Sequence, residues 1–192
     1  MADTTDSSAD EAVLSASIRL GRVVPSGASR PPSHRSVAAP LMKLLDIIRP
    51  DTIRVPLAAT SKHEAIEELV DLLAERKCIG DPAGLKRVVW EREMQRSTGI
   101  GEGLAIPHGK CPGLRSLVAA IGKPAQPIDF DAIDEKPVRL VILLASPNDR
   151  IAEHIQALGR ISRAMADPAF RNTAYECEDA ASLFKLFEDA DA

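Results

Sequence analysis

A continuous apolar segment, residues 140–145, constrains the fold more than any other feature of this sequence. Leucine, valine, isoleucine and alanine follow one another there without a polar residue. A strand with one exposed face alternates apolar and polar side chains, whereas a strand covered on both faces is apolar throughout. The segment from Arg139 to Ala145 therefore predicts a strand inside a sheet that has helices on both faces.

Other segments supply the elements that such a sheet needs. Two further strands are predicted from alternating or continuous apolar residues, over 53–57 and 117–121. Four helices are predicted from periodic apolar residues and start signals, over 61–77, 81–95, 149–167 and 180–187. The first opens on the capping-box pair Ser61 and Glu64, and the second has Pro82 in its first turn. The pattern predicts an α/β fold: a single three-layer α/β/α domain with a mixed sheet flanked by helices.

Composition excludes several classes of protein. The chain is 45% apolar but only 3% aromatic, which suits an aliphatic core. A net charge of −4 gives no basic field, so nucleic acid is not an expected partner. Three cysteines without a Cys-x-x-Cys pair give no metal or redox motif. The acidic N-terminus lacks the design of a secretion signal, and no apolar run approaches the roughly 20 residues of a membrane span. We expect a cytoplasmic protein without membrane insertion.

Residues 1–41 differ from the rest of the chain. They are rich in serine, alanine, proline and arginine and show no sustained hydrophobic period. Such a segment buries too little apolar surface to offset the entropy lost on ordering. We therefore predict a disordered tail over 1–41 and one folded domain over 42–192.

The segment 97–110 carries the clearest chemical signal. Its glycines are spaced so that backbone N–H groups could close on anionic oxygens. Pro107, with its fixed φ, aims His108, which a lysine follows two residues later. A histidine presented in this way suits nucleophilic attack on a phosphoryl group. The hydroxyl groups of the segment could donate to that group or simply shape the loop. The predicted phosphate loop comprises Ser97, Thr98, Gly99, Gly101 and Gly103.

Two polar residues lie on helix faces that otherwise point toward the core. Arg92 follows Leu85 by seven residues on one predicted helix, and His154 lies inside the apolar stripe of another. Burying unpaired polar groups is costly, so both need partners. Arg92 could be a salt-bridged helix end and His154 a core histidine bound to a carbonyl. Alternatively, both could bind phosphoryl oxygens. His63, at the margin of its helix, is expected to be a solvated surface residue.

The segment 97–110 resembles the phosphorylation-site motif of enzyme IIA components of bacterial phosphotransferase systems. The resemblance is to the mannitol/fructose class, EIIA type 2, and within it to the nitrogen-regulatory branch. It extends from about Lys43 to the C-terminus, through further blocks at 90–93, 127–134 and 153–158. Since the segment from Met42 is similar to the ordinary start of a family member, Met42 is an alternative natural start.

The resemblance implies a phosphoryl carrier. An HPr-like phosphocarrier would donate a phosphoryl group to His108, with Arg92 and His154 at the positions that flank the phosphorylated histidine in the family. The carrier would then act mainly in nitrogen or metabolic regulation through a target protein, or pass the group to a separate IIB domain. No metal or organic cofactor is implied. A histidine with a pKa of about 6.5 is largely neutral at cytoplasmic pH, so no general base is needed.

Glu102 departs from the pattern of the nitrogen-regulatory branch, whose members commonly carry asparagine in this loop. A carboxylate near an incoming dianion repels it, unless Glu102 points to solvent or pairs with Lys110. Two other classes remain open: a binding-only regulator with vestigial phosphorylation, and an enzyme that binds a dinucleotide or a metal. The glycine loop runs into Pro107 rather than into a long helix, which disfavours a dinucleotide. Two histidines without a third ligand make a poor zinc site.

Overall fold

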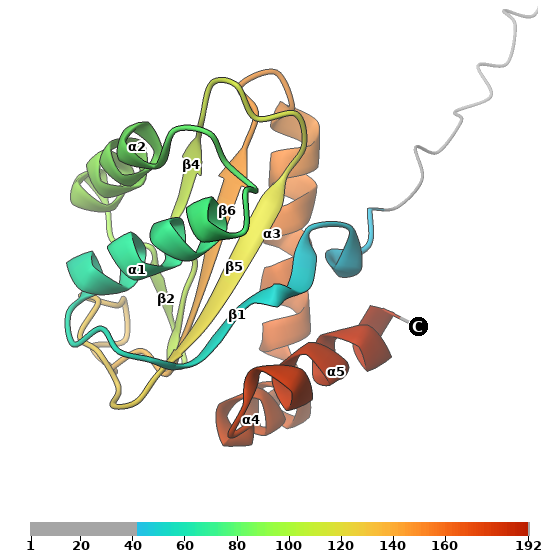
Figure 1. Ribbon diagram of the computed structural model, residues 1–192. Coiled ribbons are helices and arrows are strands. Elements are labelled where there is room, and N and C mark those ends of the chain that lie inside the picture. Colours follow the sequence, from blue (N-terminus) through green and yellow to red (C-terminus); the bar gives the residue numbers. More distant parts are fainter. Residues whose placement is uncertain (1–41, 192) are drawn as a thin grey trace, which may run out of the picture. The chain divides into compact units, whose positions relative to one another are not determined.

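The computed structural model describes residues 42–191, shown in colour in Figure 1, and the predicted tail, 1–41, lies outside them. The strands are β1 (Ile48–Leu57), β2 (Gly99–Gly101), β3 (Leu104–Ala105), β4 (His108–Lys110), β5 (Val118–Pro124) and β6 (Leu140–Ser146). The helices are α1 (Lys62–Glu75), α2 (Pro82–Gln95), α3 (Ile151–Ala166), α4 (Pro168–Glu176) and α5 (Ala180–Asp191), and a short 3-10 helix, Leu44–Asp46, precedes β1.

Strand β6 lies inside the sheet, as its apolar sequence predicts. The strand order is β1-β5-β6-β3-β2, and β4 also pairs with β6. Strand β6 is antiparallel to β5 and parallel to β3 and β4, so the sheet is mixed. Every residue of β6 is buried. The predicted buried strand and mixed sheet are therefore confirmed.

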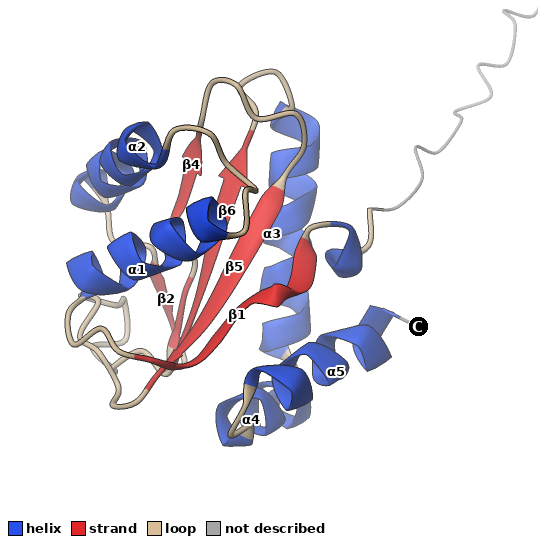
Figure 2. Ribbon diagram, viewed as in Figure 1, coloured by secondary structure: helices blue, strands red, loops and turns tan. Residues whose placement is uncertain are grey.

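Helices cover both faces of this sheet (Figure 2). Helices α1 and α2 pack against the odd-numbered residues of β6 from Val141 to Ala145. Helices α3, α4 and α5 lie on the other face and share its core with the even-numbered residues from Leu140 to Leu144, and α5 packs against β1. Because successive side chains of a strand point to opposite faces, one strand contributes to two cores. The three-layer α/β/α architecture is confirmed.

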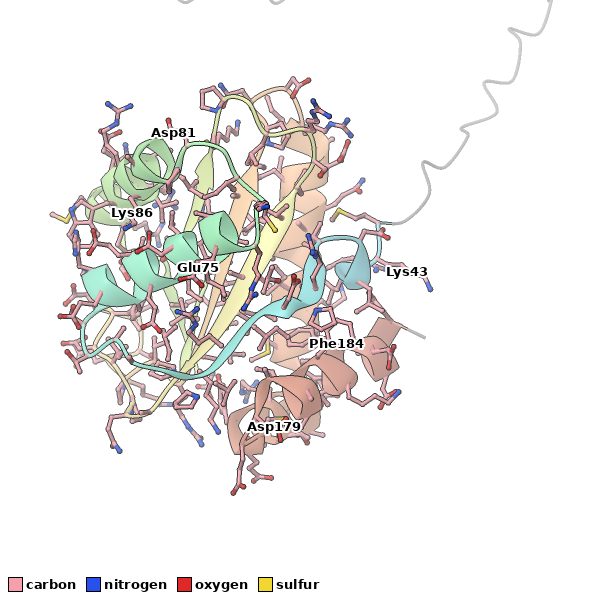
Figure 3. The ribbon with its side chains drawn as sticks, in the orientation of Figure 1. Lys43, Glu75, Asp81, Lys86, Asp179 and Phe184 are labelled. Carbon is pink, nitrogen blue, oxygen red and sulfur yellow. The ribbon has the colours of Figure 1, made fainter. Side chains whose placement is uncertain are left out.

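Ion pairs join the outer parts of the α1 and α2 layer. Lys86 of α2 lies 2.8 Å from Asp71 of α1, and Arg54 of β1 lies 2.9 Å from Glu75 of α1. Figure 3 labels Lys86 and Glu75 on their helices. Partly exposed pairs of this kind contribute only about 0–1 kcal/mol each. The apolar contacts beneath them are therefore the main reason why these helices stay on the sheet.

The structure differs from the predicted elements in several places: β1 begins five residues before the predicted strand 53–57, and the 3-10 helix Leu44–Asp46 was not predicted. Helix α4 was not predicted, because only Ala174 and Tyr175 of this short helix are buried and so few positions show no period. The segment expected to be a single loop, 97–110, contains the short strands β2, β3 and β4. It forms strands because its backbone pairs with itself and with β6, a partner that lies far along the chain.

Candidate active site

His108 is the first residue of β4 and pairs with Leu144 of β6. Its Nδ1 atom lies 2.7 Å from the backbone oxygen of Ile106. A carbonyl oxygen can only accept a hydrogen bond, so Nδ1 carries the proton. In the neutral ring, Nε2 then holds the free lone pair, and the backbone itself sets the tautomer.

His154 lies beside His108. The segment that joins β6 to α3 places the first turn of α3 at the C-terminal end of β6, and His154 belongs to that turn. The two imidazole centroids are 5.4 Å apart, with the ring planes at 58°. Nδ1 of His154 lies 2.8 Å from the buried Ser146 hydroxyl. If that hydroxyl donates, Nε2 of His154 carries the ring proton and becomes a hydrogen-bond donor.

Burial keeps both imidazoles neutral. Burial lowers the pKa of His108 and the Arg92 charge lowers it further, while the hydrogen bond to Ile106 and the Glu93 charge act in the opposite direction. Burial also lowers the pKa of His154 to about 4, with smaller contributions from His108 and Lys110. At neutral pH, Nε2 of His108 is therefore available as a nucleophile.

Helix α2 brings Arg92 and Glu93 to this site. It packs closely on β4 because residue 109 is glycine: a Cβ there would lie 2.9 Å from Cγ2 of Val89. The buried residues of α2 are Leu85, Val89 and Glu93. Arg92 is only half-buried, at the margin of that stripe, and its Nη1 donates to the Arg96 oxygen at 2.8 Å. The fully buried charge in this turn is Glu93.

The hydroxyl groups of Ser97 and Thr98 donate within the protein. Ser97 Oγ donates to the Phe130 oxygen at 2.5 Å, and Thr98 Oγ1 donates to Glu93 Oε2 at 2.5 Å. A hydroxyl has a single proton to donate. In this structure both residues shape the segment, and Gly99 continues it as the first residue of β2.

Gly101 and Gly103 are not brought to His108. They form the turn between β2 and β3, where their φ angles are 96° and 81°. The Gly103 oxygen accepts hydrogen bonds from the N–H groups of Arg139 and Leu140, at the start of β6. His108 pairs four residues farther along β6, so the turn is ~13 Å from it along the strand. Strands β2 and β4 lie toward opposite ends of the sheet (Figure 1).

Glu102 belongs to the same distant turn. Its carboxylate lies 2.9 Å from Lys136 Nζ and 3.6 Å from Arg171 Nη2, rather than against Lys110. The Tyr175 hydroxyl donates to the Glu102 backbone oxygen at 2.7 Å. The carboxylate of Glu102 therefore already has cationic partners at this distant turn.

Sequence reasoning missed Glu93 and Ser146. Glu93 continues the four-residue spacing of Leu85 and Val89, which was a usable signal, but a glutamate near a helix end is ordinarily taken as solvated. Ser146 directly follows the apolar run of β6, and its link to His154 becomes visible only when α3 folds back on the sheet.

Comparison with known proteins agrees with this architecture. Residues 46–190 match the family model described as "Phosphoenolpyruvate-dependent sugar phosphotransferase system, EIIA 2". The chain belongs to this family of phosphotransfer components.

Two relatives and one solved structure illustrate its range. A nitrogen regulatory protein of Bradyrhizobium diazoefficiens is 34% identical over 145 residues, which cover 76% of this chain and 94% of that protein. The fructose-specific EIIABC component of Bacillus subtilis is 29% identical over 150 residues, 78% of this chain but only 24% of that longer protein. The crystal structure of the nitrogen regulatory protein IIA-Ntr from Neisseria meningitidis superposes with a TM-score of 0.69 at 29% identity, covering 74% of this chain and 97% of that one.

Among residues 42–191, no helix is long and apolar enough to cross a membrane.

Proposed function

We propose that the protein is a cytoplasmic phosphoryl carrier that accepts a phosphoryl group on Nε2 of His108 from an HPr-like phosphocarrier. The observation that carries this proposal is the 2.7 Å hydrogen bond from His108 Nδ1 to the Ile106 oxygen. It leaves the lone pair on Nε2 and holds the ring in one orientation. Neutrality of His108 at cytoplasmic pH completes the requirements for a nucleophile.

The transfer needs no general base. The Nε2 lone pair forms a bond to phosphorus while the bond between phosphorus and the donor's nitrogen breaks, and the electron pair of that bond returns to the donor. The His108 ring gains positive charge, and its Nδ1 proton stays on the hydrogen bond to Ile106. Negative charge spreads over the phosphoryl oxygens, so positioning and charge stabilisation dominate catalysis.

We propose that three side chains stabilise the phosphoryl oxygens. Arg92 acts on His108 electrostatically, and its guanidinium has five N–H donors, of which the Arg96 oxygen accepts from only one nitrogen. His154 would donate from Nε2, with Ser146 holding the opposite ring nitrogen. Lys110 lies two residues after His108 on the same strand, and therefore on the same face of the sheet.

We infer that regulation, mainly of nitrogen or other metabolism through a target protein, is the principal role. This inference is supported by the relatives named as nitrogen regulatory proteins, which match this chain over nearly their whole length. Transfer to a separate IIB domain in sugar transport is the alternative, favoured by the likeness to a fructose-specific component. Either partner could dock on α3, where Ile151 and Ile155 are 53% and 63% exposed beside His154.

The test is phosphorylation in a reconstituted system of phosphoenolpyruvate, enzyme I and an HPr-like carrier. The wild type should gain one acid-labile phosphoryl group, and His108→Ala should gain none. His63→Ala is the matched control, since His63 is half exposed on α1, where its side chain lies beside Glu67 and Trp90. Stoichiometric labelling of His108→Ala would refute the assignment. An unlabelled wild type would favour a binding-only regulator, and discharge onto a fructose-type IIB would favour the transport role.

A further inference from the structure

Glu93 is a buried carboxylate that the transfer chemistry above does not use. Only 2% of the residue is exposed, and none of its side chain. Its Oε2 atom accepts two hydrogen bonds from Thr98, at 2.9 Å from the backbone nitrogen and 2.5 Å from Oγ1. Its Oε1 atom is buried without a hydrogen-bond partner among the described residues.

The nearest cation compensates Glu93 only in part. Lys62 Nζ lies 3.7 Å from Glu93 Oε1, but it lies closer, at 2.5 Å, to the exposed carboxylate of Asp131. Removing a carboxylate from water is costly unless it is well paired, and replacing a buried ion pair by well-packed apolar residues is often neutral for stability. Anchoring Thr98 would require an acceptor but not a negative charge. The charge therefore calls for a function other than holding the fold together.

A chain of hydrogen bonds leads from Glu93 to the imidazole. Glu93 fixes Thr98 through both the backbone and the side chain. The backbone oxygen of Thr98 accepts a hydrogen bond from the Ile106 N–H at 3.0 Å. The backbone oxygen of Ile106 accepts one from His108 Nδ1 at 2.7 Å. Glu93 therefore fixes Thr98, and Thr98 fixes Ile106. The Ile106 carbonyl in turn sets the tautomer of His108.

We propose that Glu93 is a positioning residue for His108: through Thr98 and Ile106 it fixes the ring with Nε2 outward, and its negative charge stabilises the imidazolium that forms when Nε2 bonds to phosphorus. The second half of this inference rests on the proposed function. The Glu93 charge raises the pKa of His108, which agrees in sign with stabilisation of a positive ring. Its neighbour Arg92 has the opposite effect on the ring and would instead attract the phosphoryl oxygens.

Three variants separate the two parts of this role. Glu93→Gln keeps an oxygen that can accept from Thr98 but removes the charge. Thr98→Val removes one of the two hydrogen bonds and keeps the charge. Glu93→Ala removes both contributions. Glu91→Gln is the control, because Glu91 lies on the same helix with its side chain 63% exposed.

The measurement is the nitrogen-15 spectrum of the His108 side chain across pH, with the melting temperature and the phosphorylation rate recorded for each variant. Glu93→Gln should keep the Nδ1–H tautomer, lower the pKa of His108 and slow phosphorylation by about ten- to a hundredfold. Glu93→Ala should add the second tautomer, and Thr98→Val should do so to a smaller extent. Glu91→Gln should match the wild type in all three.

Each outcome decides between positioning and structure. If Glu93→Gln and Thr98→Val lower only the melting temperature and leave the tautomer, pKa and rate of His108 at wild-type values, Glu93 is structural and the inference fails. Since these two variants keep the shape of the site, the result does not depend on whether Glu93→Ala folds. If the wild type is not phosphorylated at all, the proposed function fails. The tautomer and pKa of His108 in the variants still test whether Glu93 positions His108.

Discussion

The two ends of the segment 102–108 are six residues apart in sequence but differ in environment. In the turn between β2 and β3 the Glu102 side chain is exposed, and its carboxylate pairs with Lys136 and Arg171. The end at His108 is largely buried, and its hydrogen bonds lead through backbone groups to the buried Glu93. Water screens the electrostatic interaction of exposed ion pairs, whereas a buried group interacts more strongly with nearby charges and dipoles. Substitutions at His108's end should therefore change transfer, and substitutions at the turn should change little besides local stability.

The largest effect after loss of His108 itself is expected at its two flanking side chains. Arg92→Ala or His154→Ala should slow phosphorylation by about 2–4 kcal/mol of activation free energy, the usual result of losing a donor that stabilises transition-state charge. Single-turnover labelling from a phosphorylated HPr-like carrier measures this loss. Wild-type rates in both variants would mean that other groups bind the phosphoryl oxygens. The expectation that substitutions near His108 change transfer would then be wrong for these two residues.

A second effect should appear in the pH dependence of stability. The pKa of His154 is about 4 in the folded chain against 6.5 as the ordinary value. The unfolded chain therefore binds more protons between these values, and stability falls as the pH falls from 6.5 to 4, by up to about 3 kcal/mol from this residue. Urea unfolding at a series of pH values measures the slope, which should flatten in His154→Gln. An unchanged slope in that variant would show that other groups account for it.

Two glycine substitutions compare the ends directly. Gly109→Ala places a Cβ 2.9 Å from Val89 on α2, beside His108, and should cost about 1–3 kcal/mol of stability and also slow transfer. Gly101→Ala meets a φ of 96°, which L residues rarely adopt, and should cost a similar amount of stability. Its rate per folded molecule should equal that of the wild type. A slowed Gly101→Ala protein would indicate that the turn communicates with His108.

Sequence alone predicted the layers better than the site. The apolar run 140–145 has a pattern that only burial on two faces explains, so the central strand followed from it. The distance between Gly101 and His108 depends on the register of β2 against β3 and of β3 and β4 against β6, which no local pattern encodes. Glu93 lies in the periodic apolar stripe of α2, yet its meaning depends on Thr98 and Ile106, whose pairing forms only in the folded sheet. Local periodicity predicts helices and strands, whereas the candidate site depends on contacts between elements that are far apart in sequence.

The smallest effect is expected at Glu102, and it is the sharpest test of the difference between the ends. Residue 102 has a φ of 53°, a left-handed conformation that asparagine adopts more readily than glutamate. Glu102→Asn loses an exposed pair with Lys136 and a partly exposed pair with Arg171, each worth about 0–1 kcal/mol, and it relieves part of the backbone strain.

These contributions oppose one another, so the free energy of unfolding of Glu102→Asn should lie within about 1 kcal/mol of the wild type. Its phosphorylation rate should not change, because the turn is ~13 Å from His108 along β6. Lys136→Gln is the matched control, since it removes the main partner of Glu102 while leaving the backbone unaltered. A markedly faster rate in Glu102→Asn but not in Lys136→Gln would show that the carboxylate repels the incoming phosphoryl donor from a distance. The two ends of the segment would then act as one electrostatic unit.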